Sequence, residues 1–479
     1  MNTTKKSAAT SAKAAKTAKK ETTKVKSTTR HDTAVRTMKA KKPVKWRSPT
    51  FDELFASDQP PTMPPKLPAL VDAVTISTPD IFKEHVAQRC FAPLGIYPVG
   101  LEFEYIDNRP RSLRINCLGM SVSGGGKDTS FTPVRKHILI DMDERDAINR
   151  KRIEDYKEEC ASVEGTAKTP KRPKDAIVQG ILPNITPAEL VQKMLDAGDA
   201  TLYLPLNELE KWDGVEGKTK HQFTILKTAD DEDNEYGADR AGTKSVSGKG
   251  CLRLNWDAST TIGYAQKYFG RAVNEGPIQR TIMVLVPDQE IDADIPIYGK
   301  YDAKYDARLK PFIENLKAAK GYVVCKEAKV FIGKLKKEFD QFNVRSQDRT
   351  LSVLGRRSLV AAFRKACLIY AANGMRWEKG IIEDFCRWSF QMDMWCKAKF
   401  FLDQIREADD SVKIAKTGPR NKLALLPEEF TQNDAAQMRE KEGMKSDGTY
   451  DMLAQWVKRK YIERLDKEKY RKTENGKKL

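Results

Sequence analysis

Apolar runs of strand length alternate with capped, helically spaced segments between residues 70 and 300. The runs that predict strands are residues 101–106, 115–120, 200–208, 251–257 and 280–287, and those that predict helices include residues 81–90 and the segment that opens at Thr186. Because the two kinds of segment alternate, we expect an α/β fold with a mainly parallel sheet. Ligands of such sheets lie at the carboxyl ends of the strands.

The pattern becomes helical from about residue 305, most clearly over residues 356–372 and 377–405. Phe385, Trp388, Met392 and Trp395 recur at helical spacing, which predicts a buried stripe and not a platform for stacking bases. Near the end of the chain, two short helices (431–442 and 449–459) precede a possible basic hairpin (461–463 and 469–471). This outline is typical of a winged helix, and the alternative is a basic helical tail with no role in DNA binding.

These patterns predict five regions. Residues 1–48 form a disordered basic tail, and residues 49–69 form a proline-rich linker. An α/β core spans residues 70–300 and contains a charged helical insert at 142–175, and residues 301–410 form a helical extension. Residues 420–479 form the basic, winged-helix-like module.

The net charge of +18 is concentrated at the two ends of the chain. Residues 1–48 hold fifteen Lys and Arg against two acidic residues, and residues 457–479 hold ten against four, so the rest is close to neutral. Basic ends on a neutral body suit a protein that binds polyanions, above all DNA, although a solubilising tail has the same composition. RNA binding by the lysine-rich tail is a third hypothesis.

No segment resembles a secretory signal or a membrane-spanning helix, which predicts a cytoplasmic protein with no membrane partner. The eight cysteines are scattered without a CxxC pair, and there are only four histidines. We therefore expect reduced thiols and no zinc site.

A glycine-rich sequence, SVSGGGKD at residues 121–128, directly follows the predicted strand 115–120. A glycine-rich turn between a strand and a helix lets backbone N–H groups converge on a phosphate, and a following lysine reaches the outer phosphates. The candidate phosphate-binding residues are Ser123, Gly124, Gly125, Gly126, Lys127, Asp128 and Thr129.

The match to the P-loop pattern GxxxxGK[ST] is partial. Ser121 replaces the first glycine, and Asp128 replaces the hydroxyl residue that binds Mg²⁺, unless Thr129 supplies that hydroxyl. An ordinary glycine-rich surface turn is the alternative interpretation.

Nucleotide hydrolysis also needs an acidic group at the end of a neighbouring strand. Glu208 ends the strand 200–208, and Asn207 occupies the place of the usual metal-binding aspartate, so Asp128, Thr129 and Asn207 are the candidate Mg²⁺ ligands. The alternative is a Glu208 that only caps a helix. The next strand, expected to lie between the other two, brings Asn255 and Asp257 as candidate γ-phosphate sensors, and Arg280, followed by Arg240, is the candidate arginine finger.

In chain order, several of these segments resemble one family, the domain-of-unknown-function family of primase-helicase-like P-loop ATPases of bacterial mobile elements and phages. They are residues 80–107, the glycine loop, the charged insert, residues 185–190, the strand ending in Glu208, residues 274–287 and the helix that starts at Arg356. The resemblance covers residues 70–405, and residues 418–461 are similar to the winged-helix tail of some members.

The resemblance implies a RecA- or AAA+-like P-loop core that uses ATP and Mg²⁺ for work on DNA during replication or mobilisation of an element. It implies that Lys127 is the phosphate lysine, Glu208 the catalytic acid, Arg280 the finger-like arginine and Arg364 a lid sensor. The family loop reads small-residue-Ser-Gly-Lys-Ser, so Gly125 and Asp128 depart from it, as does Asn207 from the acidic motif.

Two hypotheses follow. The first is a DNA-associated, helicase-like ATPase with degenerate Walker motifs, which forms a homo-oligomer because an arginine finger acts across a subunit boundary. The second is a catalytically impaired nucleotide-binding protein, or a purely DNA-binding accessory or regulatory protein. In both, the candidate DNA-binding residues are Lys458, Arg459, Lys460, Lys469, Arg471 and Lys472.

Overall fold

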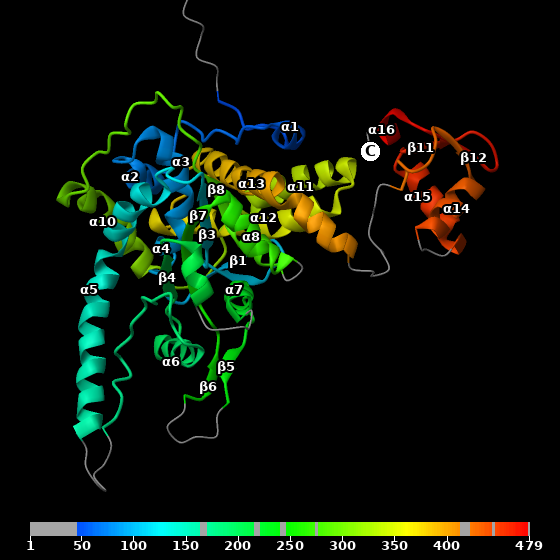
Figure 1. Cartoon of the computed structure of the whole chain (residues 1–479). Helices are drawn as coiled ribbons and strands as arrows, with labels where there is room; N and C mark the ends of the chain where they lie inside the picture. The colour runs from blue at the N-terminus through cyan, green and yellow to red at the C-terminus, as the bar shows by residue number, and fades with distance from the viewer. Residues whose placement is uncertain are drawn as a thin grey trace, which may run out of the picture. The chain divides into compact units, whose positions relative to one another are not determined.

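A four-stranded, fully parallel sheet lies at the centre of the main folded body (Figure 1). The computed structural model describes residues 46–162, 170–214, 221–239, 246–273, 276–411, 422–442 and 446–477. The strands, in spatial order, are β4 (Leu202–Leu206), β7 (Leu254–Thr261), β3 (Asn116–Ser121) and β8 (Ile282–Leu285). Gly180 adds a parallel bridge to Tyr203 on the outer side of β4. The expected α/β fold with a mainly parallel sheet is confirmed.

Strand β7 lies between β3 and β4, as the sequence predicted, but it is shifted along the chain. The prediction placed it at residues 251–257, whereas the strand runs from Leu254 to Thr261 and pairs with β3 up to Ser121. The added residues, Ala258 to Thr261, are small or polar and buried along almost their whole length. A run of that kind lacks the apolar alternation that marks a strand in sequence.

Two helices bracket the glycine loop. Helix α3 (Asp80–Arg89) packs against β3 and β8, and α5 (Lys127–Ser162) begins directly after the loop. Of the predicted charged insert, residues 142–162 form the distal part of α5, whose last buried residue is Asn149, and residues 163–169 lie outside the described residues. This half of α5 extends away from the sheet, in cyan in Figure 1. Between α3 and β3 lie α4 (Phe91–Leu94), β1 (Leu101–Glu104) and β2 (Pro110–Ser112).

The middle of the chain alternates short elements around the sheet. They are α6 (Pro187–Ala197), the 3₁₀ helix η1 (Leu209–Gly214), α7 (His221–Asp230), β5 (Tyr236–Ala238), β6 (Gly248–Gly250), α8 (Ile262–Gly270) and α9 (Pro277–Arg280). Thr186 caps α6 as predicted, since its hydroxyl accepts a hydrogen bond from the Glu189 amide. The end of α7 is followed by the antiparallel β5–β6 pair.

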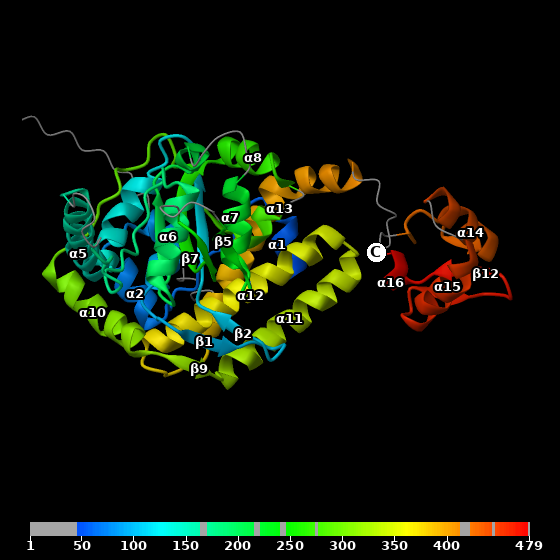
Figure 2. The same cartoon turned by 90° about the horizontal axis from the view of Figure 1, so that it is seen from below.

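Four long helices follow, and they share one hydrophobic core with the sheet. They are α10 (Ala303–Ala318), α11 (Lys326–Ser346), α12 (Arg349–Ala372) and α13 (Ile381–Ser411), with β9 (Gly321–Val323) pairing with β1 (Figure 2). The side chains of Phe385, Trp388, Met392 and Trp395 are buried, so the predicted buried stripe is confirmed. Helix α13 covers the edge of the sheet, because Asp393 accepts a hydrogen bond from the Met283 amide of β8 (2.8 Å).

The proline-rich segment that we expected to be a linker packs on this body. The predicted segment, residues 49–69, contains α1 (Phe51–Ala56) and ends at the first residue of α2 (Ala69–Thr75). The indole of Trp388 donates to the Pro61 carbonyl (2.9 Å), and the indole of Trp395 donates to the Ser57 carbonyl (3.0 Å). Buried indole N–H groups need acceptors, and the proline-rich backbone supplies them.

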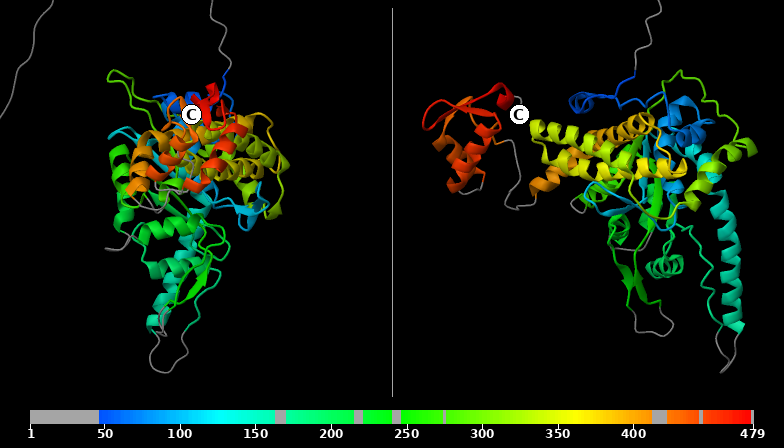
Figure 3. Two further views of the ribbon diagram at one scale, coloured as in Figure 1. Left: turned by 90° about the vertical axis from the view of Figure 1, so that its right-hand side faces the viewer. Right: turned by 180° about the vertical axis from the view of Figure 1, so that it is seen from behind.

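The last described part of the chain has a small core of its own (Figure 3). It contains β10 (Glu429–Thr431), α14 (Gln432–Lys441), η3 (Ser446–Gly448), α15 (Thr449–Lys458), β11 (Ile462–Arg464), β12 (Lys469–Lys472) and α16 (Glu474–Lys477). The antiparallel sheet has the order β10-β12-β11. The two predicted helices and the basic hairpin are confirmed as elements. Nowhere in the described ranges is there a helix with the length and apolar character needed to span a bilayer.

Candidate phosphate-binding site

The glycine loop, residues 122–126, joins the carboxyl end of β3 to the first residue of α5. Gly124 and Gly126 have φ angles of 80° and 73°, in the left-handed region that side chains disfavour. A Cβ atom on Gly126 would lie 2.7 Å from the Phe82 ring of α3, whereas none on Gly124 would meet an atom within 4 Å. Gly126 is therefore required both by its backbone angle and by the approach of Phe82.

Helix α3 holds the start of α5 through the Lys127 carbonyl. The His85 Nε2 atom lies 3.0 Å from this oxygen, and Arg89 Nη1 donates to it at 3.4 Å. Burial, followed by the charge of Arg89, lowers the pKa of His85 well below its usual range, so the imidazole is neutral. The same Nε2 atom also lies 3.0 Å from Arg89 Nη1, so the imidazole, the guanidinium and the Lys127 carbonyl form one buried polar group.

A glycine on β3 makes room for this contact. A Cβ atom on Gly119 would lie 2.2 Å from His85 Cε1 and 3.1 Å from the Arg89 side chain. Any larger residue at position 119 would displace the imidazole from the Lys127 carbonyl. The absence of a side chain on β3 therefore allows α3 to position the loop.

A buried charged cluster lies beneath the loop. Asp257 of β7 accepts hydrogen bonds from Arg89 Nη2 (2.5 Å) and from the Tyr203 hydroxyl of β4. Arg135, two turns into α5, has its Nη1 atom 3.6 Å from Asp257 Oδ2 and donates from Nη2 to Asn207 Oδ1 (2.7 Å). Two guanidinium groups thus share the Asp257 carboxylate, which joins α3, α5 and β7 beneath the loop.

The same cluster connects α5 to the end of β4. Burial alone would lower the pKa of Arg135, but electrostatic interactions, chiefly with the Asp257 carboxylate, outweigh burial and raise that pKa. The Asn207 amide oxygen is used by Arg135, so it is not a free metal ligand in this arrangement. Asp128 is half-buried and Thr129 exposed on the first turn of α5. Within the described ranges, no group of three or more His, Cys, Asp or Glu is arranged to hold a metal ion.

Lys127 differs from the other cations near the loop. Its side chain is half-buried, and its ammonium has no hydrogen bond or ion pair within the described part of the chain. Its neighbours Arg89 and Arg135 are both held by Asp257. Lys127 is therefore the cation beside the loop that has charge to offer to a ligand.

Two carboxylates follow β4, and they lie in different environments. Glu208 is 62% exposed, and its nearest cation is Lys211 at 3.9 Å. Glu210, in η1, is half-buried; its Oε1 accepts from the Thr260 hydroxyl (3.4 Å), and its buried Oε2 has no partner among the described residues. Thr260 pairs with Met120, next to the last residue of β3. Glu210 is therefore the carboxylate packed against the sheet edge from which the glycine loop leaves.

The structure does not bring Asn255 to this edge. Asn255 lies near the first residue of β7, at the opposite end of the strand. Its side chain accepts from the Ile115 amide (3.0 Å) and donates to the Ala92 carbonyl (2.9 Å). The polar residues at the tip of β7 are Thr260 and Thr261.

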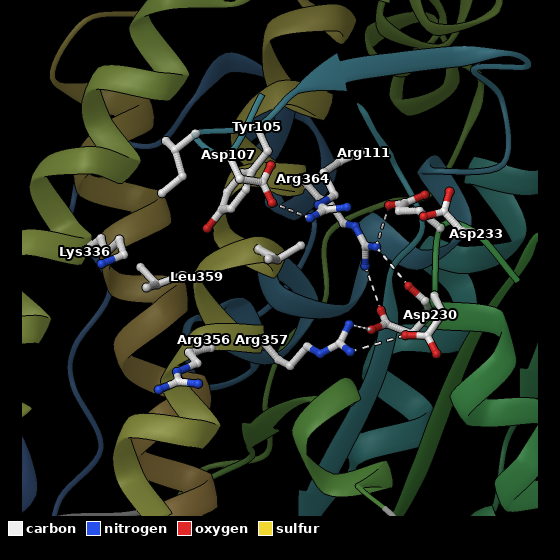
Figure 4. A pocket seen from close by; sticks show the side chains of 14 residues that line it. Tyr105, Asp107, Arg111, Asp230, Asp233, Lys336, Arg356, Arg357, Leu359 and Arg364 are labelled. Carbon is white, nitrogen blue, oxygen red and sulfur yellow. Dashed lines mark hydrogen bonds and ion pairs between the residues drawn. The ribbon is translucent and has the colours of Figure 1, made fainter. Parts of the chain in front are cut away.

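The two candidate arginines also lie at the amino ends of the strands. Arg280 ends α9, just before β8, and its closest carboxylate contact is Asp231 (3.4 Å). Arg364 is buried and pairs with Asp230 (2.7 Å) and Glu232 (2.8 Å). Figure 4 shows Arg364 and Arg357 directed at the acidic residues of this cluster. Neither Arg280 nor Arg364 joins the glycine loop, and Arg240 lies outside the described residues.

This second cluster lines a cavity of about 550 Å³ with balanced charge. Burial would raise the pKa of Glu232, but the charges of Arg364 and Arg114 outweigh it and lower that pKa to about 2. The pairing of Arg364 with residues 230 and 232 accounts for its position away from the glycine loop, and no local pattern in the sequence indicates this pairing.

The basic residues of the C-terminal part differ in their exposure and in their contacts with other residues. Lys458, Arg459 and Lys460 are exposed at the end of α15, and Lys469 is exposed on β12. Arg471 pairs with Glu429 (2.7 Å), and Lys472 donates to the Leu426 carbonyl (2.6 Å). The end of α15 is thus the more available basic surface.

Sequence reasoning missed four residues of the site, His85, Arg89, Arg135 and Glu210. A signal existed only for Glu210, a second carboxylate two residues beyond Glu208. No protein-family model matches this chain, and a search of curated proteins gave no significant match.

Proposed function

We propose that this protein is a P-loop-type ATPase that acts on DNA, with residues 122–127 as the phosphate-binding loop. One observation carries the proposal: a glycine loop leaves the carboxyl end of β3, and its Lys127 has no protein partner in the described part of the chain. A loop of this kind at a helix start provides backbone N–H groups and a positive dipole for a phosphate.

The neighbouring strands support the same proposal. The order β4-β7-β3 places one strand between the loop strand and the strand that leads to the acidic residues. We assign Glu210 as the group that orients the attacking water, because its Oε2 atom has no described partner and Thr260 fixes the other oxygen. Arg280 and Arg364 have no role in this assignment.

Mg²⁺ fits the loop as the counter-ion of ATP. Asp128 and Thr129 are the residues of this chain that would hold it, directly or through water. The ion would neutralise phosphate charge, which also relieves the repulsion between Asp128 and a triphosphate.

DNA is the proposed macromolecular partner. The C-terminal sheet of three antiparallel strands, with α14 and α15 beside it, resembles a winged helix. The exposed Lys458, Arg459 and Lys460 continue from α15, and phosphate contacts from such residues supply sequence-independent affinity.

The test compares the wild-type protein with Lys127→Ala. We expect the variant to lose about 10- to 100-fold in ATP affinity, the effect of removing one charged hydrogen bond to phosphate, and to lose ATPase activity with and without single-stranded DNA. Lys151→Ala, at an exposed lysine in the distal part of α5, is the matched control and should behave as wild type. Equal rates of ATP hydrolysis in wild type and Lys127→Ala would rule out the proposed ATPase activity.

A non-catalytic DNA-binding protein is the second candidate. The exposure of Glu208 and the carboxylate at position 128 favour it, because both depart from an efficient hydrolytic site. In that case DNA binding persists, and ATP hydrolysis stays at background in every variant.

A further inference from the structure

An extended acidic segment connects β8 to α10, and we name residues 287–299 the acidic arm. Three isoleucines of the arm are almost fully exposed: Ile291 (108%), Ile295 (87%) and Ile297 (88%). Single exposed apolar residues are common on protein surfaces and need no explanation. Three within seven residues, with none of them packed on the body, indicate a surface that a partner covers.

Both ends of the acidic arm are fixed to the body. The Val286 amide donates to the Met120 carbonyl of β3 (2.7 Å), and the Gly299 amide donates to the Ser77 carbonyl (2.8 Å). Tyr298 stacks on Phe82, the ring that also packs against Gly126 of the glycine loop. The arm is thus anchored beside the candidate phosphate-binding site, and only its middle is uncovered.

The charge of the acidic arm restricts what can cover it. Its charged residues are Asp288, Glu290, Asp292 and Asp294, and it contains no Lys or Arg. Four negative charges repel nucleic acid, so DNA is excluded as the occupant. The complementary surface is basic, with apolar side chains spaced among the charges.

Helix α11 presents a surface of this kind. Val330, Lys334, Lys337, Gln341 and Val344 are exposed at helical spacing along one face. The helix holds six Lys and Arg against three acidic residues. An open surface pocket of about 530 Å³ includes part of this face; its lining residues all belong to α11 and are Gly333, Lys336, Lys337, Asp340, Gln341, Val344 and Arg345.

We propose that the acidic arm of one copy docks on the exposed face of α11 of a second copy of this chain. The arm leads into α10, which lies toward the other end of the main body from α11 in Figures 1 and 2, and both helices pack against α12. Two different patches on one chain make a heterologous contact, which continues from copy to copy into a ring or a filament. The isoleucines meet the valines of α11, and the carboxylates meet its lysines.

The test uses two variants that each lose one patch. Ile291→Asp/Ile295→Asp/Ile297→Asp disables the arm, and Lys334→Glu/Lys337→Glu disables α11. All five positions are exposed, so folding should be preserved, and unfolding temperatures check this. By light scattering after gel filtration, wild type is expected to self-associate with rising concentration, and each variant alone is expected to be monomeric.

Mixing the two variants is the decisive step. Each retains the patch that the other lacks, so an equimolar mixture should form a dimer and stop there. Ile148→Asp, at a 64% exposed position of α5, is the control and should associate as wild type does. A wild type that is monomeric, an oligomer that persists in either variant, or a mixture that forms no dimer would each overturn the proposal. None of these readouts requires ATP, so the result is independent of the nucleotide site.

Discussion

At the scale of single residues, the environment of each carboxylate decides its use. Glu208 and Glu210 follow the same strand, but only Glu210 has a carboxylate oxygen that is buried and unpaired among the described residues. Burying an unpaired polar atom costs about 1–3 kcal/mol, so such an atom in a folded protein indicates a missing partner. In the proposed ATPase, that partner is the attacking water.

Glu210→Gln is therefore expected to remove ATP hydrolysis and to leave ATP binding intact. The loss should be about 10²- to 10⁴-fold in kcat, the range for a group that positions or deprotonates the nucleophile. Glu208→Gln is the matched variant and should retain most of the activity. Steady-state ATPase assays and binding titrations of both variants check this. A larger loss of kcat in Glu208→Gln than in Glu210→Gln would show that Glu208 is the catalytic carboxylate.

His85 gives the protein a pH-dependent stability. Its pKa lies well below the unfolded-state value of about 6.5, because burial and the charge of Arg89 oppose protonation. Below pH 6.5 the unfolded chain therefore binds a proton that the folded chain does not, and stability falls as the pH falls. Glu232, with its pKa lowered to about 2, loses its contribution only below its usual pKa of 4.5, in a separate window.

We expect the free energy of unfolding to rise between pH 5 and 6.5 with a His85 contribution of up to about 1.4 kcal/mol per pH unit. His85→Gln places an amide near the Lys127 carbonyl and does not titrate, so its slope should be smaller in this window. Urea unfolding of both proteins at several pH values measures the slopes. Identical slopes would show that the imidazole is not buried as described.

At the scale of elements, the connection from β3 to α5 depends on backbone angles that only glycine adopts without strain. Gly124 and Gly126 have nearly the same positive φ, but only Gly126 faces a neighbouring ring. The two positions therefore separate the backbone requirement from the packing requirement.

Gly124→Ala and Gly126→Ala should each lose about 1–2 kcal/mol of stability through the backbone. Gly126→Ala should lose a further 1–3 kcal/mol, roughly the effect of overpacking, through its contact with Phe82. Gly263→Ala is the control, since this helical glycine has open space around it and alanine favours a helix by up to about 1 kcal/mol. Chemical unfolding gives all three values, and equal losses at positions 124 and 126 would contradict the Phe82 contact.

Elements with strong local signals could be predicted from the sequence. The strand–glycine–helix junction is marked by residues 121–127 themselves, and the buried stripe of α13 is marked by large apolar side chains at helical spacing. The shifted frame of β7 could not be predicted, because its last residues are small and polar and are buried only by the strands on both sides. The packing of the proline-rich segment depends on two indoles more than 300 residues away.

At the scale of the whole molecule, part of the candidate site could be predicted from the sequence, and part depends on long-range contacts. Lys127 and the acidic segment after β4 are brought to one edge by parallel pairing, which the alternation of strands and helices predicts. The placement of Arg280 and Arg364 at the other edge arises from ion pairs with residues 230–232, formed across 49 to 134 positions of the chain. Ion pairs between residues so far apart in the chain cannot be predicted from local sequence patterns.

The central claim is that the loop amides and Lys127 bind the phosphates of ATP. Hydrogen exchange of the full chain, with and without Mg·ATP, tests it most directly. We expect slower exchange over residues 122–131 and 207–212 on adding ATP, and no change in Lys127→Ala. If ATP instead leaves these segments unchanged, or protects only the residues around Arg357 and Arg364, the glycine loop is not the nucleotide site.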